Sequence, residues 1–366
     1  AGPGWGRVGW LFAVGPLLIL SYYSVIAGWT VRYAIESIAT GFPEEAAEHF
    51  GRVATGQGAI AYHVGFMAAT LAVVMAGVKG GIERASLILM PALFFIVVGL
   101  AIWATTLSGG AAGYRVYLQP EISALSDPAV WRAAAAQSFF SLSLGMGAMI
   151  TFASYLERTH DLPESATIVS FTDFGVAFVS GLVVFPVIYS LGLQGAVSES
   201  TVGALFIALP GAFESMGLVG HVVGLFFFVV LAVGALTSAI SLLEVVTSSV
   251  IDEFGVPRKA AAVGVAVTAA VLGLLPATSL DALGLMDKIA GEFALVIGTL
   301  LIAIVAGWVA RGTVTDELLA GTSPFWRRQV PRIVLAIRYV VPVLIVIVLV
   351  FSSGETVKAL RDFFAG

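Results

Sequence analysis

The sequence of 366 residues contains no cysteine, only four histidines and few charged residues. The lack of cysteine excludes disulfide bonds, thiol catalysis and cysteine metal sites. The histidines are scattered and form no metal-binding pattern, and neither a glycine-rich phosphate loop nor a Ser-His-Asp grouping is present. The net charge of -5 comes without a basic cluster, which argues against nucleic acid as a partner. The sequence therefore indicates no enzyme and no nucleic-acid-binding protein.

Long apolar runs dominate the sequence. Charged residues make up 11% of the chain and hydrophobic residues 59%, with a mean hydropathy of +1.00. Soluble domains have roughly 25% charged residues, and an apolar run of about 20 residues can cross a bilayer core ~30 Å thick. We therefore predict an all-α integral membrane protein, with one transmembrane domain over residues 1–366 and nine spans. The predicted spans are 8–38, 59–78, 85–107, 130–156, 166–191, 221–250, 260–275, 285–309 and 330–351.

One predicted span contains residues that favour an open helix. Residues 137–158 are QSFFSLSLGMGAMITFASYLER, with Ser141, Ser143, Gly145 and Gly147 close together in the chain. Glycine weakens a helix, and serine side chains compete for backbone hydrogen bonds. A backbone opened at membrane depth is tolerated only where protein or a water-filled cavity surrounds it. The pattern therefore predicts a transporter with a ligand site near the middle of the bilayer.

The segment 234–259 is a second polar stretch within a predicted span. Thr237, Ser241 and Glu244 recur at helical spacing along one face, and Ser238 is adjacent. Hydroxyl and carbonyl oxygens are the ligands that a hard cation such as sodium prefers. The same hydroxyls could instead bond within their own helix or join two helices. Glu244 favours a functional role, because an ionisable group inside a span is costly without one.

Further polar residues lie within or near other predicted spans. Tyr22 and Tyr23 are near the centre of the first span, although tyrosines are more usual at membrane interfaces. A hydroxyl there either holds a substrate carboxylate or bonds to a neighbouring helix. Asp173 needs a cation, a proton or a hydrogen-bond donor, unless it lies at a helix end near the interface. Asp287 is either a gate acid that awaits an arginine or an acid favoured by a helix N-terminus.

Basic residues predict the orientation in the membrane. They are concentrated in alternate connections between spans, which the positive-inside rule assigns to the cytoplasm. The N-terminus of the chain is then cytoplasmic and the C-terminus external. The apolar part of the connection 193–220 is too short to span and is broken by proline, so we predict a helical hairpin at the mouth of a vestibule. The basic residues concerned are Lys79, Arg84, Arg158, Arg258, Lys259, Arg311, Arg327, Arg328 and Arg332.

The chain resembles the neurotransmitter:sodium symporter family over essentially its whole length, in particular the prokaryotic amino-acid transporters. The similar stretches are QSFFSLSLGMGAMITFASYLER, which looks like the family's unwound sixth helix, ALTSAISLLE, VKGGIERASLILMPALFF, SYYSVIAGW and LDALGLMDKIAGEF. The resemblance implies the leucine-transporter fold, an inverted-repeat helix bundle. Residues 8–107 would be the remainder of the first repeat, 130–309 the second repeat with its broken helix at 130–156, and 330–351 an extra C-terminal span. The first two helices of the family would be missing, so the resemblance implies an N-terminally truncated chain.

The resemblance implies residue roles in a substrate site. Tyr23 matches the tyrosine that binds the substrate carboxylate, and Phe140 matches an aromatic lid above the substrate. Other matched positions line the pocket or contact the substrate, namely Ile19, Ser141, Ser143, Met146, Ser238 and Leu242. These side chains form an apolar pocket, which predicts a small hydrophobic or aromatic amino acid. Met146 stands where an aromatic residue is common in the family.

The resemblance also implies two sodium sites, each supplied only in part by this chain. Ser141 matches a ligand of the first site. Thr172 and Asp173 match this site ambiguously, and Asp173 is either a sodium ligand or a fixed negative charge that replaces chloride. The matched ligands of the second site are Gly234 through its carbonyl, Thr237 and Ser238. The matched gate residues are Asp287 and Phe140 on the outer side, and Tyr155 and Asp252 on the inner side.

These features predict a sodium-coupled amino-acid symporter of the cell membrane that works by alternating access. One alternative is a non-transporting membrane sensor or assembly protein built on a symporter scaffold. Another is a proton-coupled amino-acid carrier of the same fold, with Glu244 or Asp173 as the proton site. The predicted partners are the amino acid, sodium ions and the lipid bilayer, and a homodimer is compatible with the sequence.

Overall fold

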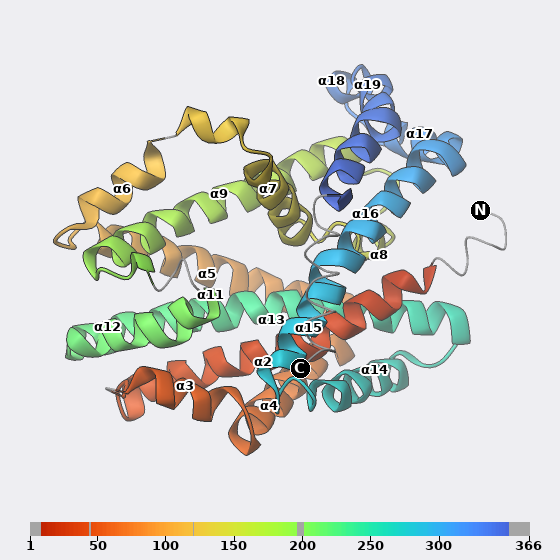
Figure 1. Cartoon of the computed structure of the whole chain (residues 1–366). Coiled ribbons are helices and arrows are strands. Elements are labelled where there is room, and N and C mark those ends of the chain that lie inside the picture. Colours follow the sequence, from red (N-terminus) through yellow and green to blue (C-terminus); the bar gives the residue numbers. More distant parts are fainter. Residues whose placement is uncertain (1–8, 44, 120, 196–200, 351–366) are drawn as a thin grey trace.

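The computed structural model describes residues 9–43, 45–119, 121–195 and 201–350, and the regular structure in these ranges is helical (Figure 1). The α-helices are α2 (Leu11–Ala39), α3 (Ala46–Ala54), α4 (Gln57–Met75), α5 (Glu83–Ala104), α6 (Gly110–Leu118), α7 (Pro128–Ser141), α8 (Ala148–Ala153), α9 (Leu162–Ser190), α11 (Thr201–Gly203), α12 (Leu209–Ser215), α13 (Leu218–Phe254), α14 (Arg258–Gly273), α15 (Leu280–Met286), α16 (Leu295–Ile304), α17 (Arg311–Leu319), α18 (Pro324–Arg327) and α19 (Val330–Leu335). Turns of other helical types are η1 (Val78–Ile82), η2 (Ile122–Ser126), η3 (Ala204–Ala208), η4 (Asp287–Ala294), η5 (Val305–Val309) and η6 (Ala336–Val340).

Seven helices in the described ranges are long and apolar enough to cross a membrane. They correspond to seven of the nine predicted spans, with ends shifted by a few residues. The other two predictions fall on shorter helices. The span at 130–156 is divided between α7 and α8, and the span at 260–275 falls on the 16-residue α14. The seven are Leu11–Ala39, Gln57–Met75, Val78–Ala104, Leu162–Ser190, Leu218–Phe254, Leu280–Val309 and Val330–Val350.

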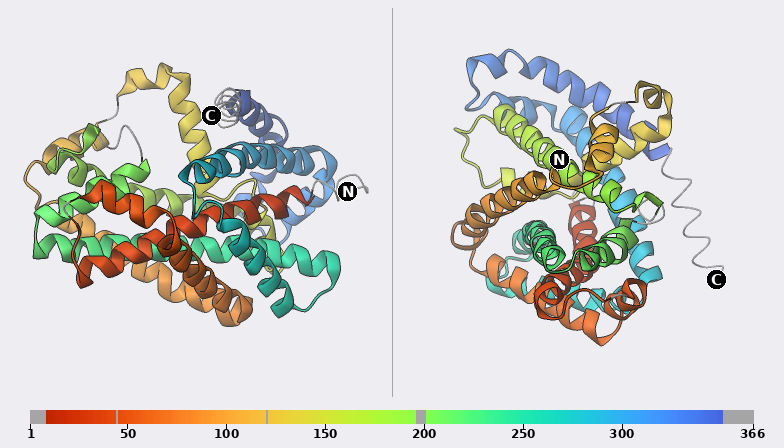
Figure 2. Two further views of the ribbon diagram at one scale, coloured as in Figure 1. Left: turned by 60° about the horizontal axis from the view of Figure 1, so that its bottom comes forward. Right: turned by 90° about the vertical axis from the view of Figure 1, so that its left-hand side faces the viewer.

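The pair α2 and α13 forms the centre of the bundle. These two helices share the most extensive helix contact of the described chain and cross the molecule together (Figures 1 and 2). Trp29 and Tyr33 of α2 are buried, and their rings pack against Phe206 and Phe228 respectively. Aromatic side chains each bury about 150–250 Å² and dominate the energetics of such a contact. The pair therefore provides a firm wall for any site along its length.

A buried histidine joins α4 and α14 to the same core. The His63 side chain is completely buried, with Nδ1 2.9 Å from Ser24 Oγ and Nε2 3.0 Å from the carbonyl oxygen of Ala270. Gly28 and Gly273 leave room for it, because an added Cβ at either would lie within 2.9 Å of a His63 atom. Buried polar groups need hydrogen-bond partners. His63 therefore fixes the position of both helices against α2.

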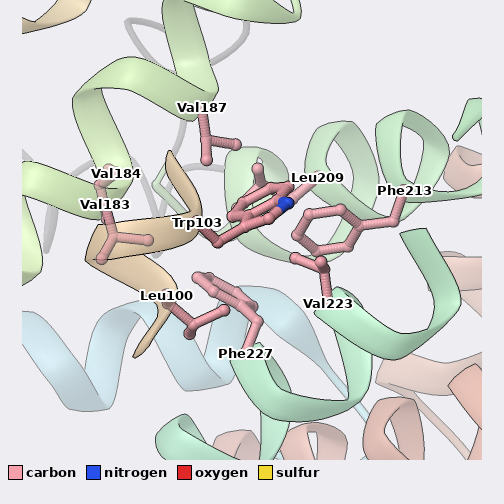
Figure 3. A pocket seen from close by; sticks show the side chains of 9 residues that line it. All are labelled: Leu100, Trp103, Val183, Val184, Val187, Leu209, Phe213, Val223 and Phe227. Atoms are coloured by element: carbon pink, nitrogen blue, oxygen red, sulfur yellow. The ribbon is translucent and has the colours of Figure 1, made fainter. Parts of the chain in front are cut away.

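The described part of the segment 193–220 forms α11, η3 and α12 beside the ends of α2 and α13. Tyr33 donates a hydrogen bond of 2.8 Å to the carbonyl of Phe206, and Phe206 and Phe213 are buried. A small cavity lies next to α12, lined by apolar side chains of α5, α9, α12 and α13 that include Leu100, Trp103, Val187, Leu209 and Phe227 (Figure 3). None of the predicted substrate-binding residues lines this cavity.

Two connections are held together by hydrogen bonds. Arg158, between α8 and α9, donates a bond of 2.7 Å to Glu317 of α17. Asp161 accepts bonds of 3.1 Å from the backbone N–H of Glu164 and 2.8 Å from that of Ser323. The connection that follows the broken helix is thereby attached to the connection between α17 and α18.

Acid is expected to weaken this attachment. Burial raises the pKa of the Asp161 carboxyl, but the N–H groups of Ser323 and Glu164 donate to its ionised form and hold the pKa below its usual value. The carboxylate therefore stabilises the fold above the unfolded-state pKa of about 3.9, and this stabilisation is lost as the pH falls through the lower folded-state pKa. Asp161→Ala should lower the free energy of unfolding by about 1 kcal/mol at neutral pH.

Thermal unfolding of both proteins across a pH series tests this expectation. The difference between the unchanged protein and Asp161→Ala should shrink as the solution is acidified below about pH 4. A difference that is the same in neutral and strongly acidic solution would contradict the role assigned to the ionised carboxylate.

Candidate functional site at the interrupted helix

The helix predicted over 130–156 is interrupted near its middle. α7 ends at Ser141 and α8 begins at Ala148. Between them, Ser143, Gly145 and Gly147 have φ values of +52°, +84° and +74°. Glycine adopts this conformation readily, whereas serine adopts it rarely. An interrupted helix leaves backbone groups without their regular helical partners, and these groups are then available to a ligand.

The interruption packs directly against the backbone of α16. A Cβ added at Gly145 would lie 2.2 Å from the carbonyl oxygen of Leu295, and one added at Gly298 would lie 2.2 Å from the carbonyl oxygen of Gly145. Thr299 flanks the same contact and is buried. Two glycines thus allow two backbones to meet without side chains between them.

Gly145→Ala is expected to be strongly destabilising. Alanine at position 145 would have to adopt the left-handed backbone conformation that Gly145 has, which costs about 1–2 kcal/mol. The new methyl group would also collide with the backbone of α16. We therefore expect the free energy of unfolding to fall by roughly 3 kcal/mol or more, in the range of severe core changes. Thermal unfolding of the purified protein in detergent measures this loss.

Gly255→Ala is the matched control for this change. Gly255 is left-handed, with φ of +63°, but no atom lies within 4 Å of its added Cβ. The control should show only the loss that comes from the backbone conformation. Equal losses at Gly255 and Gly145 would contradict the importance of the contact with α16.

The end of α7 meets α9 at a serine and a carboxylate. Ser141 Oγ donates a hydrogen bond of 2.6 Å to Asp173 Oδ1. Thr172 and Asp173 were both candidates for the first sodium site. Asp173 is the one that contacts Ser141, and Thr172 is exposed. Two residues predicted to share one sodium site are therefore in direct contact, although they are far apart in the sequence.

A second group of predicted site residues lies where α2 contacts α13. Tyr23 of α2 lies next to Ser238 of α13. On the same turn of α13, Thr237 Oγ1 donates a bond of 2.8 Å to the carbonyl of Gly234, so Thr237 bonds within its own helix. The predicted carboxylate ligand and the predicted second sodium site are therefore neighbours.

Apolar residues predicted to line the pocket belong to the main hydrophobic core. Ile19, Met146 and Leu242 are buried, and come from α2, the interruption and α13. Ser143 is half-buried. Phe140, the predicted lid, is by contrast 39% exposed. These three residues thus belong to one core that is shared by segments distant in sequence, whereas the lid position is more exposed.

Tyr22 and Asp287 form a contact between α2 and η4. The Tyr22 hydroxyl donates a bond of 2.9 Å to Asp287 Oδ1. Gly291 packs against both, because its added Cβ would lie 2.6 Å from each of these two oxygens. The predicted gate acid therefore has a tyrosine partner, and the two central tyrosines of α2 have different partners.

A buried ion pair lies near the other end of α13. Glu244 is completely buried, and both of its carboxylate oxygens accept hydrogen bonds from Arg258, at 2.9 and 2.6 Å. The hydroxyl of Tyr155 donates a third bond of 2.6 Å to Glu244. Arg258 also donates to the carbonyl of Val74 at the end of α4. Asp252, the predicted inner-gate partner of Tyr155, is exposed at the end of α13.

Arg258 is the residue of this cluster that the sequence analysis considered only for membrane orientation. The sequence signal that could have identified it is Gly255, because glycine commonly ends a helix. In the structure, Gly255 has φ of +63° and ends α13. The following helix, α14, begins with Arg258 and packs against α13. A buried acid such as Glu244 requires a cation, and the first basic residue after a tight turn is an obvious partner.

The interrupted helix, its α9 carboxylate and the paired helices α2 and α13 agree with a match to known proteins. The model of the sodium:neurotransmitter symporter family matches residues 52–362. The chain belongs to this family. This member of the sodium:neurotransmitter symporter family is also similar to a solved structure, the crystal structure of MhsT in complex with L-phenylalanine. That match has a TM-score of 0.81 and 34% identity, and covers 96% of this chain and 82% of that chain. The protein is therefore an all-helical membrane protein with the leucine-transporter fold.

Two symporter-family relatives have names that refer to sodium. An uncharacterized sodium-dependent transporter of Methanocaldococcus jannaschii is 34% identical over 326 residues, which are 83% of this chain and 66% of the relative. The sodium-dependent nutrient amino acid transporter 1 of Drosophila ananassae is 32% identical over 215 residues, which are 56% of this chain and 33% of the relative. The chain thus spans just under two thirds of the archaeal relative and a third of the insect relative.

Proposed function

We propose that the protein moves a small amino acid across the cell membrane together with sodium ions. The contact of Ser141 with Asp173 at the interrupted helix gives the most direct support. A hydroxyl, a carboxylate and the carbonyls of an interrupted helix are the oxygen ligands that a small hard cation prefers. Sodium is in this proposal a transported ion. The predicted orientation, with the N-terminus cytoplasmic and the C-terminus external, is part of the proposal.

The second proposed sodium site lies on α13. Gly234 would offer its carbonyl, and Thr237 and Ser238 would offer hydroxyl oxygens. The bond from Thr237 to Gly234 keeps both oxygens on the same turn, and a hydroxyl that donates one bond still has lone pairs for a cation. We propose that each sodium site is only partly supplied by this chain.

The proposed substrate is a hydrophobic or aromatic amino acid. Ile19, Met146 and Leu242 offer apolar surface, and Phe140 stands at the edge of the site as a lid. The Tyr23 hydroxyl is the proposed donor to the substrate carboxylate, and Ser238 lies beside it. The complex of MhsT with L-phenylalanine supports a substrate of this class.

Contacts on two sides of the site supply the proposed gates. The bond of Tyr22 to Asp287 joins α2 to η4, and the bond of Tyr155 to Glu244 joins the segment after α8 to α13. Alternating access requires that one set opens while the other stays closed. Sodium and substrate couple to this change only if each binds one state more tightly than the other.

A binding experiment on the purified full-length protein tests the proposal. Radiolabelled L-phenylalanine should bind saturably in sodium buffer and only weakly when potassium replaces sodium. Unlabelled leucine should compete, whereas glutamate should not. Equal binding in sodium and potassium would overturn sodium coupling, and no binding of any apolar amino acid in sodium would overturn the substrate class.

A proton-coupled carrier is a second candidate, because Asp173 places a carboxylate at the interruption. Glu244 is a poor proton carrier by comparison, since Arg258 occupies both of its oxygens. Uptake into vesicles with a pH gradient and no sodium separates the two candidates. Accumulation under that condition would support the proton-coupled carrier.

A further inference from the structure

An arginine lies inside the last described span rather than in the connection before it. Arg338 belongs to η6 within Val330–Val350. Its guanidinium carbon lies 4.3 Å from the ring centre of Trp308 and 5.1 Å from that of Tyr339. The indole N–H of Trp308 donates a bond of 3.1 Å to the carbonyl of Arg338. Close approach of η5 is possible because Gly307 faces the backbone of Arg338, at 2.8 Å from an added Cβ to Cα.

Among the residues that the structure describes, this guanidinium has aromatic neighbours but no anionic one. Its Nε is buried without a hydrogen-bond partner, and no carboxylate among the described residues pairs with Arg338. Aromatic faces attract a cation, but they do not satisfy the N–H donors of a guanidinium as an oxygen acceptor would. An arginine within a span normally pairs with an acid, with backbone carbonyls or with the interface. Within the described part of the chain, Arg338 therefore lacks the anion that its position demands.

The surroundings indicate that the anion comes from the bilayer. Trp308 and Tyr339 are about half exposed, and Leu335 and Val340, one turn or less away, are also exposed and apolar. Tryptophan and tyrosine are typical of the headgroup level of a membrane. A phosphodiester fits this place, because a guanidinium fork matches phosphate geometry and Arg can extend towards the interface.

The adjoining connection favours a lipid with net negative charge. It contains three exposed arginines and the first turn of the last span adds a fourth, against two acids in the connection, of which Glu317 is already paired with Arg158. The arginines are Arg311, Arg327 and Arg328 in the connection and Arg332 in α19. Juxtamembrane basic residues each gain roughly 1 kcal/mol at an anionic leaflet. This connection is also the one that the charge distribution assigns to the cytoplasmic side.

We propose that Arg338, with Trp308 and Tyr339, binds the phosphate of an anionic phospholipid headgroup. Arg338 donates to the phosphate oxygens, the two rings hold its side chain in place, and the exposed arginines of the connection select for net negative charge. The acyl chains of the lipid then lie along the apolar outer face of Val330–Val350.

Native mass spectrometry of the full-length protein tests the proposal. The protein is mixed with phosphatidylglycerol or phosphatidylcholine in detergent, and retained lipid is counted. We expect clear preference for phosphatidylglycerol, and about tenfold weaker retention in Arg338→Gln, which loses a charge-assisted hydrogen-bonding group. Arg327→Gln is the matched control, because it removes an equal charge from the exposed connection and should weaken retention by about fivefold or less.

A second variant and a competing anion separate a lipid site from a general attraction to negative charge. Trp308→Leu keeps the charge but removes the ring, and should also lower retention, which keeps the test decisive if Arg338→Gln does not fold. Equal loss in Arg338→Gln and Arg327→Gln, or equal retention of the two lipids, would overturn the proposal. So would displacement of phosphatidylglycerol by millimolar inorganic phosphate, because the site would then recognise a free anion. Sodium-dependent amino-acid binding should persist in Arg338→Gln.

Discussion

Arg258→Gln should destabilise the folded protein by about 3–5 kcal/mol, because it leaves a carboxylate buried without its cation. Glu244 is completely buried and receives two of its three side-chain hydrogen bonds from Arg258. Burial makes solvent a poor substitute for the lost guanidinium. The prediction is measured as the change in unfolding free energy, or as a large fall in the unfolding temperature of the purified protein.

Two variants serve as controls for this effect. The double change Glu244→Gln with Arg258→Gln removes both charges, and should recover much of the loss because neutral amides can hydrogen-bond to each other. Arg311→Gln removes an exposed arginine, and should alter stability by less than about 0.5 kcal/mol. If Arg258→Gln were as mild as Arg311→Gln, the buried pair would not have the energetic role assigned to it.

Asp173→Asn should weaken sodium-dependent binding of the amino acid by about 10- to 100-fold. The change keeps the size of the side chain and its contact with Ser141, but removes the negative charge next to the proposed cation. An interaction with a charged group is worth ~1.5–3 kcal/mol, which corresponds to this range. The measurement is the sodium concentration at half-maximal binding of L-phenylalanine to the full-length protein.

Glu164→Gln is the control for Asp173→Asn. Glu164 is an exposed acid in the first turn of the same helix, so its neutralisation should leave the sodium requirement unchanged. Chloride distinguishes the two proposed roles of Asp173. If the carboxylate supplies only a fixed negative charge, chloride should restore binding to Asp173→Asn. If it is a sodium ligand, chloride should have no effect, and unchanged binding in Asp173→Asn would refute both roles.

The local features of the site could be predicted from the sequence. The interruption at Ser143, Gly145 and Gly147 follows from backbone preferences of single residues, which act over a few positions. Span positions also depend on local composition, so for the seven long spans the predicted ends differ from the observed ones by at most seven residues. Two predicted spans are not among these long helices, because 130–156 is divided between α7 and α8 and 260–275 falls on the 16-residue α14.

The pairing of side chains across the bundle could not be predicted in the same way. The sequence indicated that Asp287 and Glu244 need partners, because an acid inside a span is costly. It could not say that the partner of Asp287 is Tyr22, which is distant in the chain and adjacent only after folding. Tyr155 illustrates the same limit, since it was matched with Asp252 and bonds to Glu244.

The backbone contact between Gly145 and Gly298 has a mechanical consequence. Side chains between two helices can change rotamer and absorb small displacements, whereas here carbonyl and Cα meet directly. A shift of the interruption would therefore move α16 by nearly the same amount. A ligand that displaces the interruption by a fraction of an ångström would also displace α16.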